Sequence, residues 1–266
     1  MIGIFGFALI GIVAFLVSGL TLFAGFGLGT MLLPVFALFF PVEVAVGATA
    51  VVHFANNLFK LYLLHRDMAR DVVIRFGIPA VFAAFLGAWL LTLLADQQPV
   101  VTYALGKREA VVTPLKLVMG VLIVGFAWID LLPIWDNMTA KSKLLPLGGI
   151  LSGFFGGLSG HQGALRAAFI RPLRLEPTAF AATQTGLACL VDGARIVVYG
   201  TGFLTGHFGA FLGGAQWLAV AVGILAAFAG ARVGKALLPK MTVSGLQWVT
   251  GGLLMLVGLG LASGLL

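Results

Sequence analysis

Apolar stretches follow one another along the entire chain, and they restrict its fold more than any other feature. A helix needs about 20 apolar residues to cross the hydrocarbon core of a bilayer. Because backbone polar groups in lipid must be satisfied within the protein, we expect an all-α, polytopic helical membrane protein with about eight transmembrane segments. The segments are Met1–Phe40, Val44–Leu64, Val72–Leu94, Pro114–Leu132, Leu144–Ile170, Pro177–Tyr199, Ala210–Val233 and Val243–Leu266.

The composition excludes a soluble globular domain. Hydrophobic residues make up 61% of the chain and charged residues 9%, well away from the usual balance of soluble domains. The polar interruptions at Asp96–Thr113 and Asp136–Lys143 have the length of loops. The net charge of +7 comes from basic residues scattered between apolar segments. We interpret them as topology signals, so the expected surroundings are lipid and no nucleic-acid partner is predicted.

The first and fifth segments are too long for one simple crossing, and each contains a glycine cluster. GFGLG occupies Gly25–Gly29, and GLSGHQG occupies Gly157–Gly163. Glycine in a helix interior lowers helix stability because the backbone loses more freedom on ordering. The sequence therefore predicts that both segments are broken in the middle.

The two halves of the chain resemble each other. At an offset of 134 residues (152 − 18), Ser18-Gly19 pairs with Ser152-Gly153, and Gly29 pairs with Gly163. The same offset pairs Ala48-Thr49 with Ala182-Thr183, on the helix that follows each break. Internal repeats of this kind are common in transporters. We predict two duplicated four-segment repeats of one membrane domain, residues 1–135 and residues 136–266.

Loop charges indicate that the two repeats are inverted. The loop after the second segment carries Arg66, Arg70 and Arg75, whereas its counterpart after the sixth, Thr201–Gly209, carries no charge. The loop after the first segment has no Lys or Arg, whereas its counterpart after the fifth has Arg171 and Arg174. Basic loops mark the cytoplasmic side. The swapped bias predicts one half flipped in the membrane, with each broken segment entering and leaving on one side.

These features together resemble the TauE/SafE family of sulfite and sulfonate exporters. The resemblance rests on the glycine-rich turn followed by Pro34 and Ala45–Thr49, its echo in the second half, and eight apolar segments. In the second half SGHQGALRAAF replaces the glycine and proline run, and Ala168 stands at the proline position. The resemblance implies a multi-pass secondary transporter of the bacterial inner membrane, exporting small anions such as sulfite, organosulfonates or small carboxylates.

The two breaks predict an anion site near the membrane midplane. The start of each second half-helix exposes backbone N–H groups where the helix dipole favours negative charge. We expect the two starts to converge, while the halves rock to expose the bound anion on alternate sides. The expected substrate-binding residues are Gly27, Gly29, Thr30, His53, Asn57, His161, Gln162, Gly163, Arg166 and Gln184.

Arg166 is the sharpest of these candidates. An arginine at membrane depth costs about 2.5–3.5 kcal/mol on insertion scales unless it faces a cavity or a partner. Its planar fork suits a carboxylate or sulfonate. Alternatively, Arg166 extends toward Arg171 and Arg174 at the segment end, or pairs with Asp192.

His161 and Gln162 also have two possible roles. They either bind the anion or form hydrogen bonds with backbone groups that the break leaves free. His161 could also couple transport to protons.

Lys60 and Arg195 lie near predicted helix ends, and we expect both to act as topology anchors. Asp192 and Arg195 are three residues apart, a spacing that predicts a salt bridge within the helix.

Two other classes of function remain as alternatives. The four histidines show no metal-ligand spacing, so the sequence favours neither a metal site nor an intramembrane enzyme, and no cofactor is implied. An anion channel is the stronger rival, because glycine-rich breaks also line selectivity filters. A coupling proton or sodium ion and a homodimer stay open.

Overall fold

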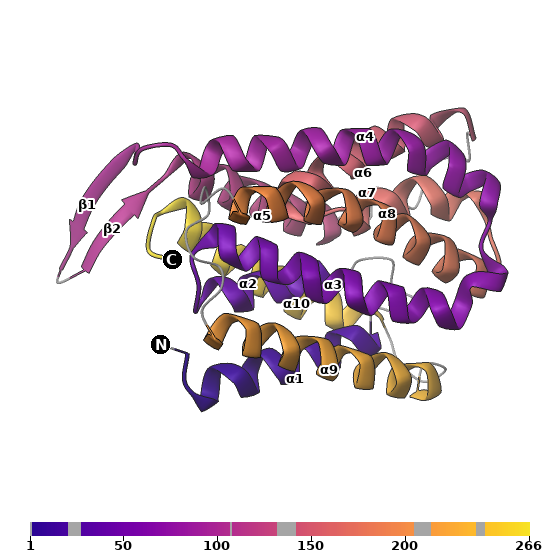
Figure 1. The fold of residues 1–266 in the computed structure, drawn as a ribbon, viewed down its shortest axis with the longest axis horizontal. Helices are drawn as coiled ribbons and strands as arrows, with labels where there is room; N and C mark the ends of the chain where they lie inside the picture. Colours follow the sequence, from indigo (N-terminus) through magenta and orange to yellow (C-terminus); the bar gives the residue numbers. More distant parts are fainter. Residues whose placement is uncertain (1, 21–27, 107, 132–141, 205–213, 238–242) are drawn as a thin grey trace.

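A computed structural model describes residues 2–20, 28–106, 108–131, 142–204, 214–237 and 243–266. Long helices lie side by side along the longest axis of the molecule (Figure 1). The helices are α1 (Ile4–Leu20), α2 (Leu28–Ala37), α3 (Val42–Leu64), α4 (Arg70–Ala95), α5 (Pro114–Leu131), α6 (Leu145–Ser159), α7 (Gly163–Ile170), α8 (Pro177–Leu204), α9 (Gly214–Leu237) and α10 (Val243–Ala262). Short 3₁₀ turns occupy η1 (His65–Asp67), η3 (Ser142–Leu144) and η4 (Arg171–Leu173).

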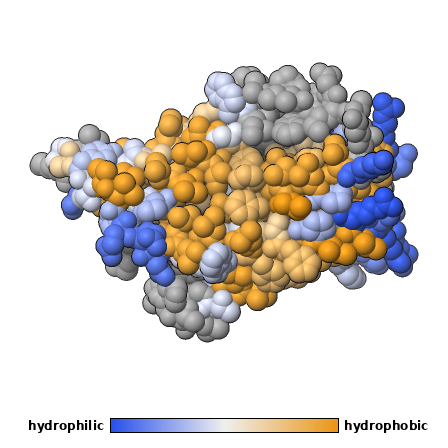
Figure 2. All heavy atoms as spheres, turned by 90° about the horizontal axis from the view of Figure 1, so that it is seen from above, coloured by the Kyte–Doolittle hydropathy of each residue, from blue (hydrophilic) through white to orange (hydrophobic). Residues whose placement is uncertain are grey.

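The outer surface of the helices is apolar. Large hydrophobic side chains such as Phe82, Trp89 and Leu225 are exposed rather than buried. Figure 2 shows apolar residues forming a belt across the middle of one face, with hydrophilic residues at its two ends. Within the described residues, the helices at Val42–Asp67, Arg70–Ala95 and Gly214–Gly234 are long and apolar enough to cross a bilayer. The chain is a membrane-embedded, mostly helical protein, as the apolar segments predict.

The fifth predicted segment forms two helices, α6 and α7, as its glycine cluster predicts. Gly160 ends α6 with φ of 81°, in the left-handed region that favours glycine. The first predicted segment also contains two helices, α1 and α2. The glycines of its break up to Gly27 lie outside the described residues.

Glycines hold α6 directly against α4. A Cβ atom added at Gly149, Gly153 or Gly157 would collide with a backbone carbonyl oxygen of α4, and those oxygens belong to Phe76, Ala80 and Ala84. The three glycines are four residues apart, so they share one face of α6. Small residues let membrane helices pack with their backbones in contact. Gly230 of α9 meets the backbone of α1 in the same way.

The expectation of an all-α fold is wrong for the loop after α4. There β1 (Val101–Leu105) pairs with β2 (Arg108–Val112) in an antiparallel hairpin, in which Leu105 lies opposite Arg108. Gly106 has φ of 64°, which suits the two-residue turn. The β-branched residues Val101, Thr102, Val111 and Val112 pair at the ends of the strands away from this turn, where they favour strand structure. The hairpin projects from one end of the helices (Figure 1).

Helix α3 runs antiparallel to α8. His53 contacts Asp192, while Leu64 packs with Ala181 and Ala182, farther toward the start of α8. At the end of this pair the Ala69 N–H donates to Thr183 Oγ1 at 3.0 Å. The turn after α3 and the connection between α7 and α8 therefore lie at the same end of the molecule.

The buried apolar residues form two large clusters. One contains residues of α1, α2, α3, α5, α9 and α10, with a few from α4, α6 and α8. The other contains Val72–Ala84 of α4 together with residues from α6, α7 and α8, including Leu187 and Ala194. In Figure 1, α4 lies at one edge of the molecule and α1 with α9 at the opposite edge, with α3 between them. The polar residues described next include His53 of α3, a helix of the first cluster, and Asp192 of α8, which contributes to the second.

Candidate functional site

The break between α6 and α7 is held by its own backbone. The Gly160 N–H donates to the Gly156 carbonyl at 2.9 Å, and the Gln162 N–H donates to the Gly160 carbonyl at 3.0 Å. The Ser152 hydroxyl donates to the Gln162 carbonyl at 3.0 Å, which fixes the entry into α7. Gly163 is the first residue of α7. The N-terminus of α7 is thus directed into the protein interior, since Gly163 and its neighbours are buried.

Asp192 of α8 is the centre of a buried polar cluster at this break. Its carboxylate is fully buried, at 0% exposure. Oδ1 accepts a hydrogen bond from Gln162 Nε2 at 2.9 Å and from Arg195 Nε at 3.0 Å. Oδ2 lies 2.7 Å from His53 Nδ1 and accepts from Asn57 Nδ2 at 3.3 Å. Groups from α3, from the break and from α8 therefore meet at one carboxylate.

Arg166 of α7 faces the interior at 4% exposure. Its Nε donates to Gln184 Oε1, and its Nη1 donates to Gln162 Oε1 at 3.0 Å. The alternative in which Arg166 extends toward the segment end is wrong, because Gln184 and Gln162 hold the guanidinium beside the break. Gln162 joins Arg166 to Asp192, since its amide group contacts both residues.

His161 contacts a backbone group freed by the break, which is one of its two expected roles. Its Nδ1 lies 3.2 Å from the Ser159 carbonyl oxygen, a backbone group at the end of α6. The imidazole also stacks on Phe126 of α5, with ring centroids 5.7 Å apart and planes at 5°. Its Nε2 has no hydrogen-bond partner among the described residues. A buried polar atom in this state can bind a ligand or an ordered water molecule.

The first break approaches the second through Gly29. A Cβ atom added at Gly29 would lie 3.6 Å from His53 Cγ and 3.7 Å from the Gly160 carbonyl oxygen. The start of α2 therefore lies beside the break between α6 and α7. Gly27 lies outside the described residues, as does the side chain of Thr30.

The prediction that Lys60 and Arg195 are anchors at the membrane surface is wrong. Lys60 is 4% exposed and Arg195 is 0% exposed. The predicted salt bridge within α8 is confirmed, because Arg195 Nη2 lies 2.8 Å from Asp192 Oδ1. Its guanidinium also lies against Gly160, where an added Cβ would be 2.6 Å from Nη1. Arg195 therefore belongs to the buried polar cluster and does not lie at the membrane surface.

A sequence signal for Asp192 and Arg195 was present, because charged residues inside membrane helices usually mark functional sites. Their three-residue spacing was sufficient to predict the pair but not its partners from α3 and α7. Those partners depend on helix packing, since His53 and Asp192 are 139 residues apart in the chain.

The cluster has chemical properties that suit an anion. Two guanidinium groups, those of Arg166 and Arg195, face the single carboxylate of Asp192. One buried donor without a hydrogen-bond partner among the described residues is Gln184 Nε2. Guanidinium groups bind carboxylate-like oxygens through paired, charge-assisted hydrogen bonds. Excess positive charge and free donors in a water-poor interior favour binding of a small oxyanion.

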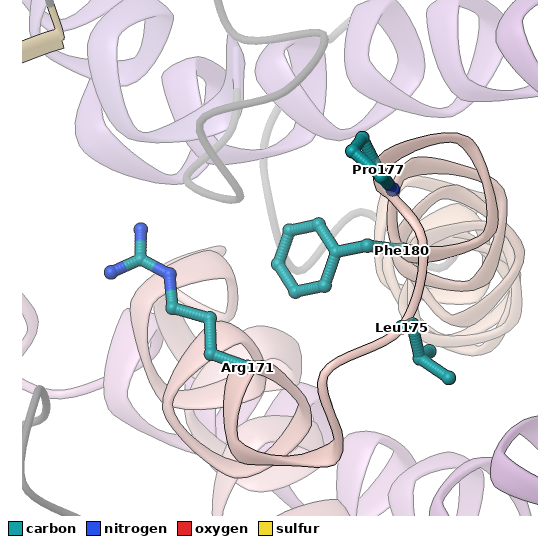
Figure 3. A pocket seen from close by; sticks show the side chains of 4 residues that line it. All are labelled: Arg171, Leu175, Pro177 and Phe180. Carbon is teal, nitrogen blue, oxygen red and sulfur yellow. The ribbon is translucent and has the colours of Figure 1, made fainter.

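A cavity of about 240 Å³ opens near the C-terminal end of α7. It is lined by Arg171, Leu175, Pro177 and Phe180. Figure 3 shows the Phe180 ring extending from its helix toward the side of the cavity that Arg171 occupies. Phe180 precedes Gln184 by four residues, or about one helical turn, and Gln184 binds Arg166. The cavity wall at Phe180 therefore lies about one helical turn of α8 from Gln184.

Comparison with known proteins identifies the family. No curated protein sequence matches the chain. The family described as "Sulfite exporter TauE/SafE" matches residues 7–261, which is nearly the whole chain. This match agrees with the resemblance in the glycine-rich turns and with the membrane-embedded helical fold. The chain belongs to the TauE/SafE sulfite exporter family of membrane transporters.

Proposed function

We propose that this protein exports small anions such as sulfite, organosulfonates or small carboxylates across the bacterial inner membrane, by alternating access. The observation that carries this proposal is the buried cluster in which, among the described residues, Asp192 is the only buried carboxylate beside the guanidinium groups of Arg166 and Arg195. Uncompensated positive charge in a low-dielectric interior is costly. A bound anion would remove that cost, and the match to the sulfite exporter family suggests which anions to test first.

In this proposal the anion binds at the start of α7, between the two breaks. The first N–H groups of a helix have no partner within the helix and favour negative charge. Arg166 would supply the guanidinium, Gln162 and Gln184 would supply further donors, and His161 would line the site. His53 and Asn57 would approach from α3, and Gly29 with Thr30 from the start of α2. Gly163 and Gly27 would allow the backbone to approach the anion closely.

The pattern of helix contacts supports an inverted duplication. If α1 to α5 correspond to α6 to α10, then the contact of α1 with α9 corresponds to that of α6 with α4. The contact of α3 with α9 likewise corresponds to that of α8 with α4, and the contact of α2 with α3 to that of α7 with α8. The pairs α3–α8 and α5–α10 correspond to themselves. A duplication produces this symmetric pattern, and the antiparallel direction of the counterparts α3 and α8 favours inverted repeats, residues 1–135 and 136–266.

Alternating access requires two bodies that move relative to each other. The close glycine contacts join α4 to α6 and α1 to α9, so each contact connects helices from different repeats. The moving bodies would therefore be two mixed helix groups, corresponding to the two apolar clusters, rather than the two sequence repeats. The polar cluster lies between these groups, where relative motion would open or close the anion site.

Exposed arginines support an orientation in the membrane. Arg66, Arg70, Arg171 and Arg174 are exposed, and the contact of Ala69 with Thr183 holds their segments at one end of the molecule. The positive-inside rule assigns that end to the cytoplasm. The cavity lined by Arg171 and Phe180 would then be the cytoplasmic entrance for the anion.

The close packing of the cluster favours a carrier over an anion channel. A channel needs a continuous pore across the membrane. Here Arg166 and Asp192 are almost fully buried, and direct hydrogen bonds cross the seam between α3 and α8. A site that is closed by hydrogen bonds and opened by relative motion suits alternating access.

Transport by purified protein in liposomes tests this proposal. We expect saturable exchange of labelled sulfite, sulfoacetate or a small carboxylate. Arg166→Ala should abolish this exchange, while Arg166→Lys should retain part of it because it keeps the charge without the planar fork. The exposed Arg66→Ala is the matched control for the loss of one positive charge. Currents that rise linearly with driving force would favour the channel, and the absence of any anion movement would overturn the proposal.

A further inference from the structure

We infer that Asp192 is an internal counter-ion that occupies part of the anion site while no anion is bound. This inference rests on the proposed transport function and deepens it. The usual role of such a carboxylate would be to hold the helices together. The geometry around Asp192 points to an additional role, because its partners are the donors that an incoming oxyanion needs.

The two carboxylate oxygens of Asp192 have different partners. Oδ1 is held by Gln162 Nε2 at 2.9 Å and by Arg195, whose Nη2 is 2.8 Å away. Oδ2 is held from α3, by His53 at 2.7 Å and Asn57 at 3.3 Å. The Oδ1 partners thus lie at the break and on α8, close to Arg166, whereas the Oδ2 partners lie across the seam between α3 and α8.

A transported oxyanion would compete for the Oδ1 partners. Carboxylate, sulfonate and sulfite oxygens all accept hydrogen bonds from guanidinium and amide donors. An anion that binds Arg166 also reaches Gln162, because the Gln162 amide already contacts Arg166. The anion takes Gln162 and part of Arg195 from Oδ1, while His53 and Asn57 keep Oδ2. No proton transfer or covalent change is needed for this exchange of hydrogen-bond partners.

The internal counter-ion has a consequence for the transport cycle. A carrier with two buried guanidinium groups and no anion faces a high cost when it closes around an empty site. Asp192 lowers that cost, so the empty carrier can return to the cytoplasmic side. Net export then proceeds without an anion on the far side. A carrier lacking Asp192 returns readily only with an anion bound, and it is restricted to exchange.

Asp192→Asn tests this inference, since it removes the charge and keeps the size of the side chain. The measurement compares net sulfite efflux into sulfite-free buffer with sulfite exchange at equal concentrations. We expect the ratio of efflux to exchange to fall at least about tenfold, and sulfite to bind about tenfold more tightly, equivalent to about 1.4 kcal/mol. The exposed Asp71→Asn, which loses only a surface pair with Arg75, is the matched control and should leave the ratio unchanged.

The outcomes separate the inference from the proposed function. Equal losses of efflux and exchange in a folded Asp192→Asn protein would overturn the inference and leave the transport function standing. If the unaltered protein moves no anion, the transport function and the inference both fail. If Asp192→Asn does not fold, infrared difference spectra of the unaltered protein, labelled with ¹³C-aspartate, decide the question. Added sulfite should shift a labelled carboxylate band, and sulfite binding without such a shift would overturn the inference.

Discussion

The helix pairs α4–α6 and α3–α8 are both buried, but different chemistry holds each pair together. Gly149, Gly153 and Gly157 bring the backbone of α6 against that of α4, where no side chain can change partners. His53 and Asn57 instead join α3 to α8 through the carboxylate of Asp192. Backbone packing through glycine has one arrangement, whereas hydrogen bonds can be exchanged for others. The comparison indicates that α4–α6 moves as one body and that the seam between α3 and α8 can open.

The largest expected effect comes from breaking the buried ion pair between Arg195 and Asp192, beside the α3–α8 seam. Arg195→Gln leaves the fully buried Asp192 without its ion pair. Removing one partner of a buried pair lowers the free energy of unfolding by about 3–5 kcal/mol. Unfolding in detergent should show this loss.

The paired variant sharpens this prediction. Asp192→Asn combined with Arg195→Gln removes both charges, so it should recover more than half of the lost stability. Stability of Arg195→Gln equal to that of the unaltered protein would show that the α3–α8 seam does not depend on the pair.

A bulky residue in the α4–α6 contact should have the next largest effect. Gly153→Leu would force a side chain against the backbone of Ala80, and overpacking of this kind costs about 1–3 kcal/mol. The midpoint of thermal unfolding should fall accordingly. Gly125→Leu is the matched control, because a Cβ atom there meets nothing within 4 Å. Equal destabilisation by both variants would contradict the role assigned to the glycines of α6.

Removing the link between Arg166 and Asp192 should affect transport more than folding. Gln162→Leu deletes the amide that contacts both residues. We expect the sulfite concentration for half-maximal exchange to rise about tenfold, equivalent to about 1.4 kcal/mol. The exposed Gln97→Leu serves as the control for the same substitution away from the site. An unchanged half-maximal concentration would remove Gln162 from the anion site.

The smallest effect is expected at Gly29, where the two breaks meet. A Cβ atom there would lie 3.6 Å from His53 Cγ, an ordinary contact distance. Gly29→Ala should change the free energy of unfolding by less than about 0.5 kcal/mol, within the usual range for mild substitutions. A loss as large as that of Gly153→Leu would show that the contact between the breaks is as rigid as the α4–α6 contact.

Sequence reasoning reached the correct family. The break beside Gly160 and the interior position of Arg166 were both predicted, because glycine clusters and intramembrane charges are local signals. The hairpin of β1 and β2 was not predicted, because the length and polarity of a segment between helices do not reveal pairing between its strands. Lys60 and Arg195 were assigned to the membrane surface because distance from a helix end does not reveal which neighbour a residue faces.

The sequence by itself determined that the chain lies in a membrane, that its fifth segment is broken, and that Asp192 can pair with Arg195. Each of these properties depends on residues within one segment or one helical turn. Only the tertiary structure decided that His53 meets Asp192 and that Gln162 joins Arg166 to that carboxylate. These contacts depend on how the glycines allow the helices to approach and on the relative position of α3, α7 and α8, which no local spacing specifies.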